Sequence, residues 1–364
     1  MKIAGVVIAA VYFGMLAAPT ETEAQAPVAP RFLSQTGLYS DVATLKIDSR
    51  NRTFSPQYPL WSDGASKRRW VRLPEGSKIN VADLAKWELP VGTKFWKEFS
   101  FQGRKVETRF LWQTAKDHWV FASYAWNDAQ TDAELASESG VANIAQIAEG
   151  KRHSIPSVTE CKACHVSNRT ETLGFDALQL STDRDPNALH AESLTSEMVT
   201  LKTLVDEDLL TPRRHDLMSA PPRIAATSPT TRAALGYLST NCGSCHNGEG
   251  SIASLGLILK QTAQGSGIGE QGLGSRDQGS GECSAAIATT VGQRGHWIVP
   301  EAPAESRIIN PGRPDASALV RRVKSRRPLS QMPPIGTVVA DKDAIELLTA
   351  WVANSAEWQN LARC

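Results

Sequence analysis

The chain has 364 residues, of which 41% are hydrophobic and 21% charged, and its formal net charge is +1. This composition is typical of a globular protein and excludes a disordered chain, while the length predicts two or three domains. The near-neutral charge gives no electrostatic reason to expect nucleic acid as a partner.

The first residues are typical of a secretory signal peptide. Lys2 supplies a positive charge, residues 3–18 form an uncharged run of 16 residues, and Ala24-Gln25-Ala26 has the small-residue pattern of a cleavage site. The run is shorter than the roughly 20 residues of a membrane-spanning helix, although an uncleaved anchor is the alternative. We therefore expect a signal peptide over 1–24, cleavage after residue 24 or 26, and a periplasmic protein without a membrane span.

Residues 27–150 favour an antiparallel β domain, because seven of the ten tryptophans lie there among β-branched and aromatic runs. Turn residues at 102–103 and 116–117 separate three of these runs, as in strands joined by hairpins. The expected strands are 94–101, 106–112 and 119–126. Short strands joined in this way favour a small sandwich.

After residue 150 the apolar spacing becomes helical. We predict helices over 195–210 and 229–240, and a last helix that Asp341 caps. The apolar face of the last helix should pack against the helix over 229–240 through Ile345, Leu348, Trp351 and Val352. Residues 265–281 are rich in glycine and predict a flexible loop.

Two short motifs carry the chemistry. Residues 161–165 read Cys-Lys-Ala-Cys-His and residues 242–246 read Cys-Gly-Ser-Cys-His, which accounts for four of the six cysteines. Two thiols three positions apart can form thioethers with the two vinyl groups of one haem, and the adjacent imidazole then binds the iron. The motifs therefore predict two covalently bound haem c groups. The expected haem-binding residues are Cys161, Cys164, His165, Cys242, Cys245 and His246.

Two other uses of paired cysteines are disfavoured. Zinc ribbons separate their pairs by about 15–20 residues, whereas 78 positions separate Cys164 from Cys242. A thioredoxin-type dithiol needs a βαβ context, which the sequence lacks. Neither alternative explains a histidine after both pairs.

Met332 is the expected distal ligand of the second haem. It lies in Gln-Met-Pro-Pro-Ile-Gly-Thr at 331–337, where two prolines fix the backbone and present the sulfur from a rigid loop. A core methionine that fills a gap in the packing is the alternative.

The distal side of the first haem has several candidates. We favour Met218, which also precedes a pair of prolines, as the iron ligand. An open or water-bound iron comes next, followed by His190 or His215, which are more often hydrogen-bonded than metal-bound. Met198 comes last, because it falls on the apolar face of the helix over 195–210.

Two further features have open interpretations. Cys283 and Cys364 can form a disulfide or remain two thiols, because the sequence does not give their separation. A basic cluster before Met332 can steer an acidic redox partner, pair with haem propionates or form a solvated helix face. This basic cluster consists of Arg321, Arg322, Lys324, Arg326 and Arg327.

Several stretches resemble known cytochromes. The stretch 242–332 resembles the class I cytochrome c fold, and 310–319 looks like the Pro-Gly-x-Pro-x-x-Ser turn and helix of bacterial cytochrome c domains. More broadly, the chain resembles a largely uncharacterised family of exported bacterial dihaem cytochromes. The segments that carry this resemblance are 59–65, 155–161, 173–180 and 241–242. The resemblance implies haem binding and electron transfer.

The expected fold is α+β and multidomain. A sandwich-like antiparallel β domain over 27–150 would precede two mainly α-helical cytochrome c-like haem domains over 151–227 and 228–364, the second with a Gly-rich insert at 261–281. The expected function is periplasmic electron transfer from a donor such as a dehydrogenase to a respiratory acceptor. An enzyme of dihaem-peroxidase type, with an open first haem site, is the main alternative, and a redox-linked binding module is another.

Overall fold

The computed structural model describes residues 27–166, 171–261, 284–296, 300–355 and 357–358. The predicted signal peptide, the glycine-rich segment 265–281 and the cysteines Cys283 and Cys364 lie outside these described residues. In the part of the chain that is described, no helix is long and apolar enough to cross a membrane.

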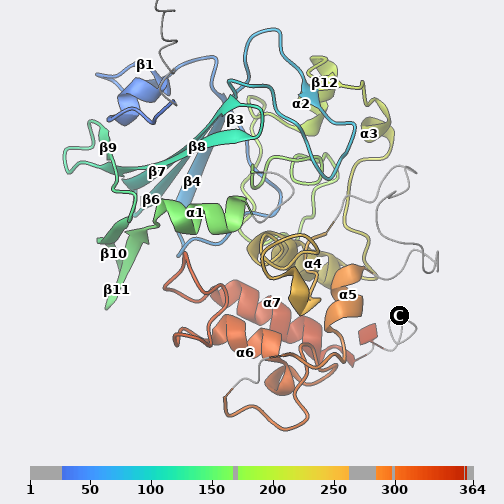
Figure 1. Cartoon of the computed structure of the whole chain (residues 1–364). Coiled ribbons are helices and arrows are strands. Elements are labelled where there is room, and N and C mark those ends of the chain that lie inside the picture. The colour runs from blue at the N-terminus through green and yellow to red at the C-terminus, as the bar shows by residue number, and fades with distance from the viewer. Residues whose placement is uncertain (1–26, 167–170, 262–283, 297–299, 356, 359–364) are drawn as a thin grey trace, which may run out of the picture.

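A six-stranded antiparallel sheet forms the upper half of the molecule in Figure 1. Its strand order is β3-β4-β6-β7-β8-β9. The strands are β3 (Arg52–Thr53), β4 (Ser66–Arg72), β6 (Lys94–Phe101), β7 (Arg104–Ala115), β8 (His118–Trp126) and β9 (Ala133–Leu135). The three strands predicted from the sequence are therefore confirmed as β6, β7 and β8.

The sandwich prediction is wrong, because no second sheet packs face to face on this one among the described residues. The remaining strands form three two-stranded ladders. These ladders pair β1 (Tyr39–Asp41) with β2 (Lys46–Ile47), β10 (Val141–Ala148) with β11 (Lys151–Ile155), and β5 (Ile79–Asn80) with β12 (Leu210–Thr211).

Different parts of the chain cover the two faces of the sheet. One face packs its large aromatic side chains, such as Trp70, Trp96 and Tyr124, against the N-terminal residues Leu33 and Leu38. This segment contains a short 3-10 helix, η1 (Leu33–Thr36). The other face is apolar at one end, where it meets residues from 175–217, and carries charged side chains further along. That face also receives the first cysteine motif.

The prediction of two mainly α-helical haem domains is wrong. Residues 151–227 contain only short helices, which are α1 (Val158–His165), α2 (Leu201–Asp206) and α3 (Asp216–Ser219). Their apolar side chains, including Phe175 and Leu201, share one buried cluster with Val71 and Phe95 of the sheet. Because this segment completes the core of the β half, it is not a separate helical domain.

The predicted helix over 195–210 is also shorter than expected. Only Leu201–Asp206 is helical, and the side chain of Thr200 caps it by accepting the backbone N–H of Thr203. Met198 therefore lies in the chain before α2 and not on the apolar face of a helix.

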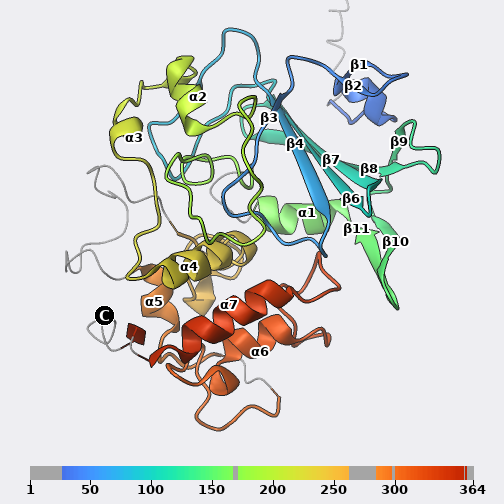
Figure 2. The same ribbon diagram turned by 180° about the vertical axis from the view of Figure 1, so that it is seen from behind.

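Four helices gather in the lower half of the molecule, as both Figure 1 and Figure 2 show. They are α4 (Pro229–Asn241), α5 (Ala285–Thr290), α6 (Ala318–Lys324) and α7 (Lys342–Ala353), with the 3-10 turns η2 (Ala253–Leu255) and η3 (Pro314–Ala316). The predicted helix before Cys242 is confirmed as α4. Asp341 caps α7 by accepting the backbone N–H of Ala344 at 3.2 Å, as expected.

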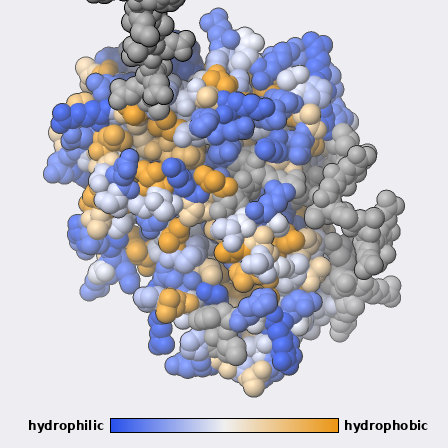
Figure 3. Space-filling view, in the orientation of Figure 1, coloured by the Kyte–Doolittle hydropathy of each residue, from blue (hydrophilic) through white to orange (hydrophobic). Residues whose placement is uncertain are grey.

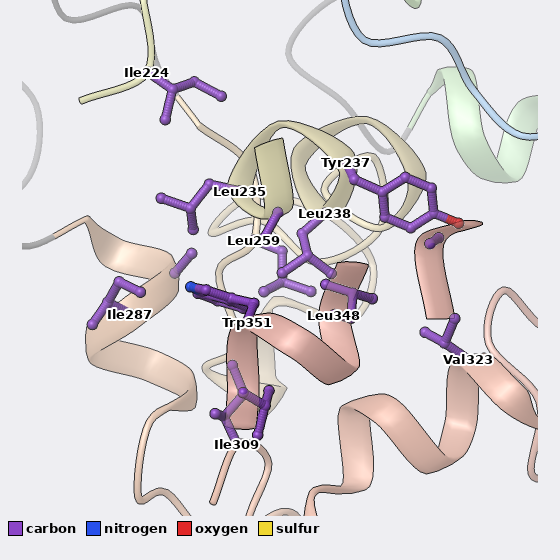
Figure 4. Packing of buried hydrophobic residues seen from close by; sticks show 14 of the residues in the cluster. Ile224, Leu235, Tyr237, Leu238, Leu259, Ile287, Ile309, Val323, Leu348 and Trp351 are labelled. Carbon is purple, nitrogen blue, oxygen red and sulfur yellow. The ribbon is translucent and has the colours of Figure 1, made fainter. Parts of the chain in front are cut away.

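The expected packing of α4 against α7 is confirmed. Figure 4 shows Leu348 and Trp351 of α7 beside Leu235 and Leu238 of α4. Trp351 is fully buried, and its indole N–H donates to the Thr231 hydroxyl at 3.0 Å. This cluster forms the core of the helical half.

Tyr58 joins the two halves, because it belongs to the segment before β4 yet packs in the core of the helical half. Its hydroxyl donates to Asp185 at 3.1 Å, and its ring lies against the backbone of Gly236 in α4. A Cβ atom at residue 236 would overlap that ring. Glycine is thus required for α4 to approach the β half closely.

We expect Gly236→Ala to destabilise the protein by about 1–3 kcal/mol, because overpacking outweighs the better helix propensity of alanine, which is worth about 1 kcal/mol. Chemical denaturation measures the effect. Gly248→Ala is the control, since its Cβ would meet nothing closer than 4.0 Å. An equal or higher stability of Gly236→Ala would contradict this account of the contact between the halves.

Candidate haem sites

The first motif lies on α1, which packs over strand β8. Ser157 caps the helix by accepting the N–H of Glu160 at 3.2 Å, and the Glu160 carboxylate accepts the N–H of Ser157 at 2.8 Å. Ser123 of β8 lies close enough to the Cys161 sulfur to act on its pKa. A capped helix on a rigid sheet thus fixes the direction in which the motif projects.

His165 has the hydrogen bonding of an iron ligand. Its Nδ1–H donates to the backbone carbonyl of Glu171, and its ring packs on the Phe121 ring with centroids 5.3 Å apart. Because a carbonyl only accepts, the proton lies on Nδ1 and the Nε2 lone pair is available. Burial lowers the pKa of His165 to about 4, which keeps the imidazole neutral. This is the arrangement that fixes a histidine ligand for a metal.

The second motif directly follows α4. Its second residue, Gly243, must be glycine for a steric reason. A Cβ atom at Gly243 would lie 2.8 Å from the Cα atom of Lys260, so no larger residue fits. The side-chain amide of Asn247 donates to the carbonyls of Gly243 and Ser244 at 3.1 and 2.9 Å. The sequence analysis missed Asn247, which closes the turn of the motif.

His246 is held by its backbone, whose carbonyl accepts the N–H of Leu259 at 2.8 Å. Burial and the nearby Arg322 charge lower the pKa of the imidazole, so it is neutral. Its Nδ1 atom is buried and has no hydrogen-bond partner among the described residues. A neutral imidazole of this kind is suited to a metal ion.

The two motifs meet at one point, although 81 positions separate Cys164 from Cys245. The thiols of Cys164 and Cys245 lie close enough to affect each other's ionisation. Their interaction and burial raise the pKa of Cys164, while the same interaction lowers the pKa of Cys245 to about 6. Burial raises the pKa of Cys242 to about 12. The fold therefore places the ends of both motifs side by side.

The cysteines do not form a zinc site in this arrangement. Among the described residues, one cluster brings three candidate ligand atoms within 4.8 Å of one another. It consists of His190, Asp341 and Asp343. No cysteine belongs to it. A tetrahedral zinc site would need four such ligands around one point, so the geometry disfavours the zinc alternative.

The loop that carries Met332 is held beside the second motif. The N–H of Met332 donates to the carbonyl of Arg322 at 3.0 Å, and the charge of Arg322 acts on His246. Further along the loop, the carboxylate of Asp63 accepts the N–H groups of Val338 and Val339 at 2.8 and 2.9 Å. The loop is therefore anchored to the β half, a role of Asp63 that the sequence analysis missed.

The candidates for the first distal ligand lie in different settings. Met218 on α3 packs against the apolar cluster of the sheet. His190 bonds Asp341 at 2.9 Å through Nε2 and stacks on Trp61, while His215 is exposed. These contacts engage Met218 in apolar packing and His190 in a hydrogen bond, so they favour neither residue as the first distal ligand.

The basic cluster before Met332 divides into two groups. Arg322 donates to the carbonyl of Ser330 at 3.2 Å, and Arg326 donates to that of Val339 at 3.1 Å, so both hold the loop. Lys324 and Arg327 are exposed. Arg321 donates to backbone carbonyls at the helix edge. The cluster is thus partly structural.

Comparison with known proteins identified no relative of this chain. No family model, no curated protein and no solved structure matches the chain. The functional argument therefore depends on the residues and their geometry.

A buried chain of ionised groups connects the first motif to the Met332 loop. Arg109 lies close enough to act on Cys161, and its guanidinium pairs with Glu107 at 2.6 Å. The Glu107 carboxylate contacts His153 Nε2 at 3.2 Å, and His153 Nδ1 lies 3.5 Å from Asp63. Burial alone would raise the pKa of Glu107, but Arg109 and His153 lower it to about 2.

This chain of charges predicts a pH window of highest stability. Burial disfavours charged His153, yet Asp63 and Glu107 outweigh it and raise the pKa above 6.5. The contribution of His153 is full below 6.5 and declines as pH rises through the raised pKa. The contribution of Glu107 is full above 4.5 and declines as pH falls toward about 2. Denaturant unfolding over a range of pH should show this window.

The variant His153→Gln should lose the decline of stability on the alkaline side, because it removes the titrating group. His215→Gln is the control, since His215 is exposed, and it should keep the decline. If both variants followed the wild-type pH profile, this chain of charges would not contribute to folding as described.

Proposed function

We propose that this chain is an exported dihaem cytochrome c that transfers electrons between redox proteins. The observation that carries the proposal is the meeting of two Cys-x-x-Cys-His motifs at Cys164 and Cys245. Each motif ends in a neutral imidazole, and the imidazole of His165 has a free Nε2 lone pair. Two such sites in one chain are what covalent haem attachment requires.

The residues have separate roles in this proposal. Cys161 and Cys164 would hold one haem and Cys242 and Cys245 the other, while His165 and His246 would bind the irons. Bound haem would supply reversible one-electron chemistry, with its reduction potential set by the axial ligands. The closeness of Cys164 to Cys245 would favour electron transfer between the two groups.

Met332 would complete the second site from its anchored loop. A thioether ligand favours the reduced iron and raises the potential. The anchoring of this loop by Asp63, Arg322 and Arg326 limits its movement when the iron changes its oxidation state. A ligand held in this way suits rapid electron transfer.

The same loop offers a surface to a redox partner. Leu329 is 88% exposed, and the basic side chains of Lys324 and Arg327 lie near it in the sequence. An exposed apolar residue with basic neighbours suits an acidic donor or acceptor protein, such as a periplasmic dehydrogenase. In the orientation of Figure 1, hydrophobic residues are exposed in patches on the face shown in Figure 3.

Intact-mass measurement under denaturing conditions tests the proposal, because thioether bonds survive unfolding. Protein expressed with haem-maturation machinery should carry two haems. The double variants Cys161→Ala/Cys164→Ala and Cys242→Ala/Cys245→Ala should each carry one. A mature wild-type chain without haem, or with zinc at its cysteines, would refute the proposal.

The substitution Met332→Ala tests the distal ligand. The second haem should become high-spin and bind carbon monoxide, and its potential should fall, because a strong axial ligand is lost. Absorption and magnetic-resonance spectra report the change. Met198→Ala is the matched control, since Met198 lies in the chain before α2. Spectra of Met332→Ala that match those of the wild type would exclude this ligand.

A further inference from the structure

A row of three cations crosses the sheet on the face that carries α1. In the strand register, Arg69 of β4 lies opposite Lys97 of β6, and Lys97 lies opposite Arg109 of β7. Directly opposed side chains share a face, and like charges in such positions destabilise a sheet. A bound negative charge would therefore stabilise this row.

The carboxylates of the protein compensate only part of this row. Arg109 pairs with Glu107 at 2.6 Å and Arg69 with Glu192 at 2.9 Å. Lys97 has no carboxylate within 4.0 Å in the described structure, and its amine lies over the Phe99 ring at 4.9 Å. Burial and the neighbouring Arg69 lower the pKa of Lys97 well below its ordinary value, so a bound anion would stabilise its charged form.

Arg69 marks the row as a site for an anion. It is only 5% exposed, and its Nη2 atom is buried without a hydrogen-bond partner among the described residues. An unpaired guanidinium nitrogen is costly in a buried place. Lys67 adds a further basic group on the same strand face, where it donates to the carbonyl of Leu60 at 2.8 Å.

The row lies beside the first motif. The charges of Lys97 and Arg109 both act on the imidazole of His165, and Arg109 also acts on Cys161 and Cys164. An anion bound at the row would therefore be close to the group that this motif holds.

We propose that Lys97 and Arg69 form an anion site that binds a propionate carboxylate of the haem attached at Cys161 and Cys164. This inference rests on the proposed function. A guanidinium and an ammonium are the donors that suit a carboxylate. The positive row also favours the reduced iron, which carries one charge less, and so raises the potential of the first haem.

The variant Lys97→Met tests the site in the holoprotein by spectroelectrochemical titration of both haems. The midpoint potential of the first haem should fall, while that of the second haem changes less. Lys97→Arg should keep the wild-type potential, because it keeps the charge. Lys94→Met is the matched control, since it lies on the same strand with its side chain on the opposite face, and it should leave both potentials unchanged.

Three outcomes would overturn the inference. The first is an unchanged first potential in Lys97→Met, and the second is a larger shift at the second haem. The third is an effect of added acetate or sulfate on the first potential of the wild type, with no such effect in Lys97→Met. This result would mean that the row binds a free anion and not a propionate. The intact mass of each sample separates these results from a failure of the proposed function, in which no haem would be present.

Discussion

The contact between Cys164 and Cys245 is the constraint on which the rest of the arrangement depends. It joins a helix that lies on the sheet to a turn that follows α4 in the other half of the molecule. Contacts such as Tyr58 on Gly236 and Asp63 on the Met332 loop fix the two halves against each other and so support this contact. The tight packing between the halves thus serves the geometry of the paired motifs.

The sheet is the platform for this geometry, and its two faces have different tasks. One face is covered by N-terminal aromatic packing, which stabilises the fold. The other carries the buried charges Arg109, Glu107 and His153 beneath α1. Desolvation offsets much of the attraction between buried ionised groups, so their net contribution to stability is smaller than that attraction. Their position beside the first motif suits a redox site, where the local charge sets the potential.

The sequence predicted what depends on short-range patterns. The hairpins over 94–126 follow from aromatic and β-branched runs separated by turn residues, and the packing of α4 on α7 follows from apolar spacing and the Asp341 cap. The motif residues were equally visible, because the spacing of their thiols is local. Their meeting was not, since it depends on how the two halves dock.

The predictions that failed depend on long-range packing, which short-range sequence patterns do not show. Short strands joined by turns predict an antiparallel sheet, but they do not show whether a second sheet or loops cover its faces, so a sandwich was expected. Phe175 and Leu201 lie in a segment whose apolar residues are buried against the sheet, so its helices stay short. The row of Arg69, Lys97 and Arg109 is set by strand register over 40 positions of sequence, which no local pattern reveals.

The most direct test of the central claim is the magnetic coupling between the two irons in the oxidised holoprotein, measured by electron paramagnetic resonance. If the haems are attached side by side through Cys164 and Cys245, the spectrum should show strong coupling that disappears in the single-haem variant Cys161→Ala/Cys164→Ala. Two haems in the wild type with independent, uncoupled spectra would contradict the account.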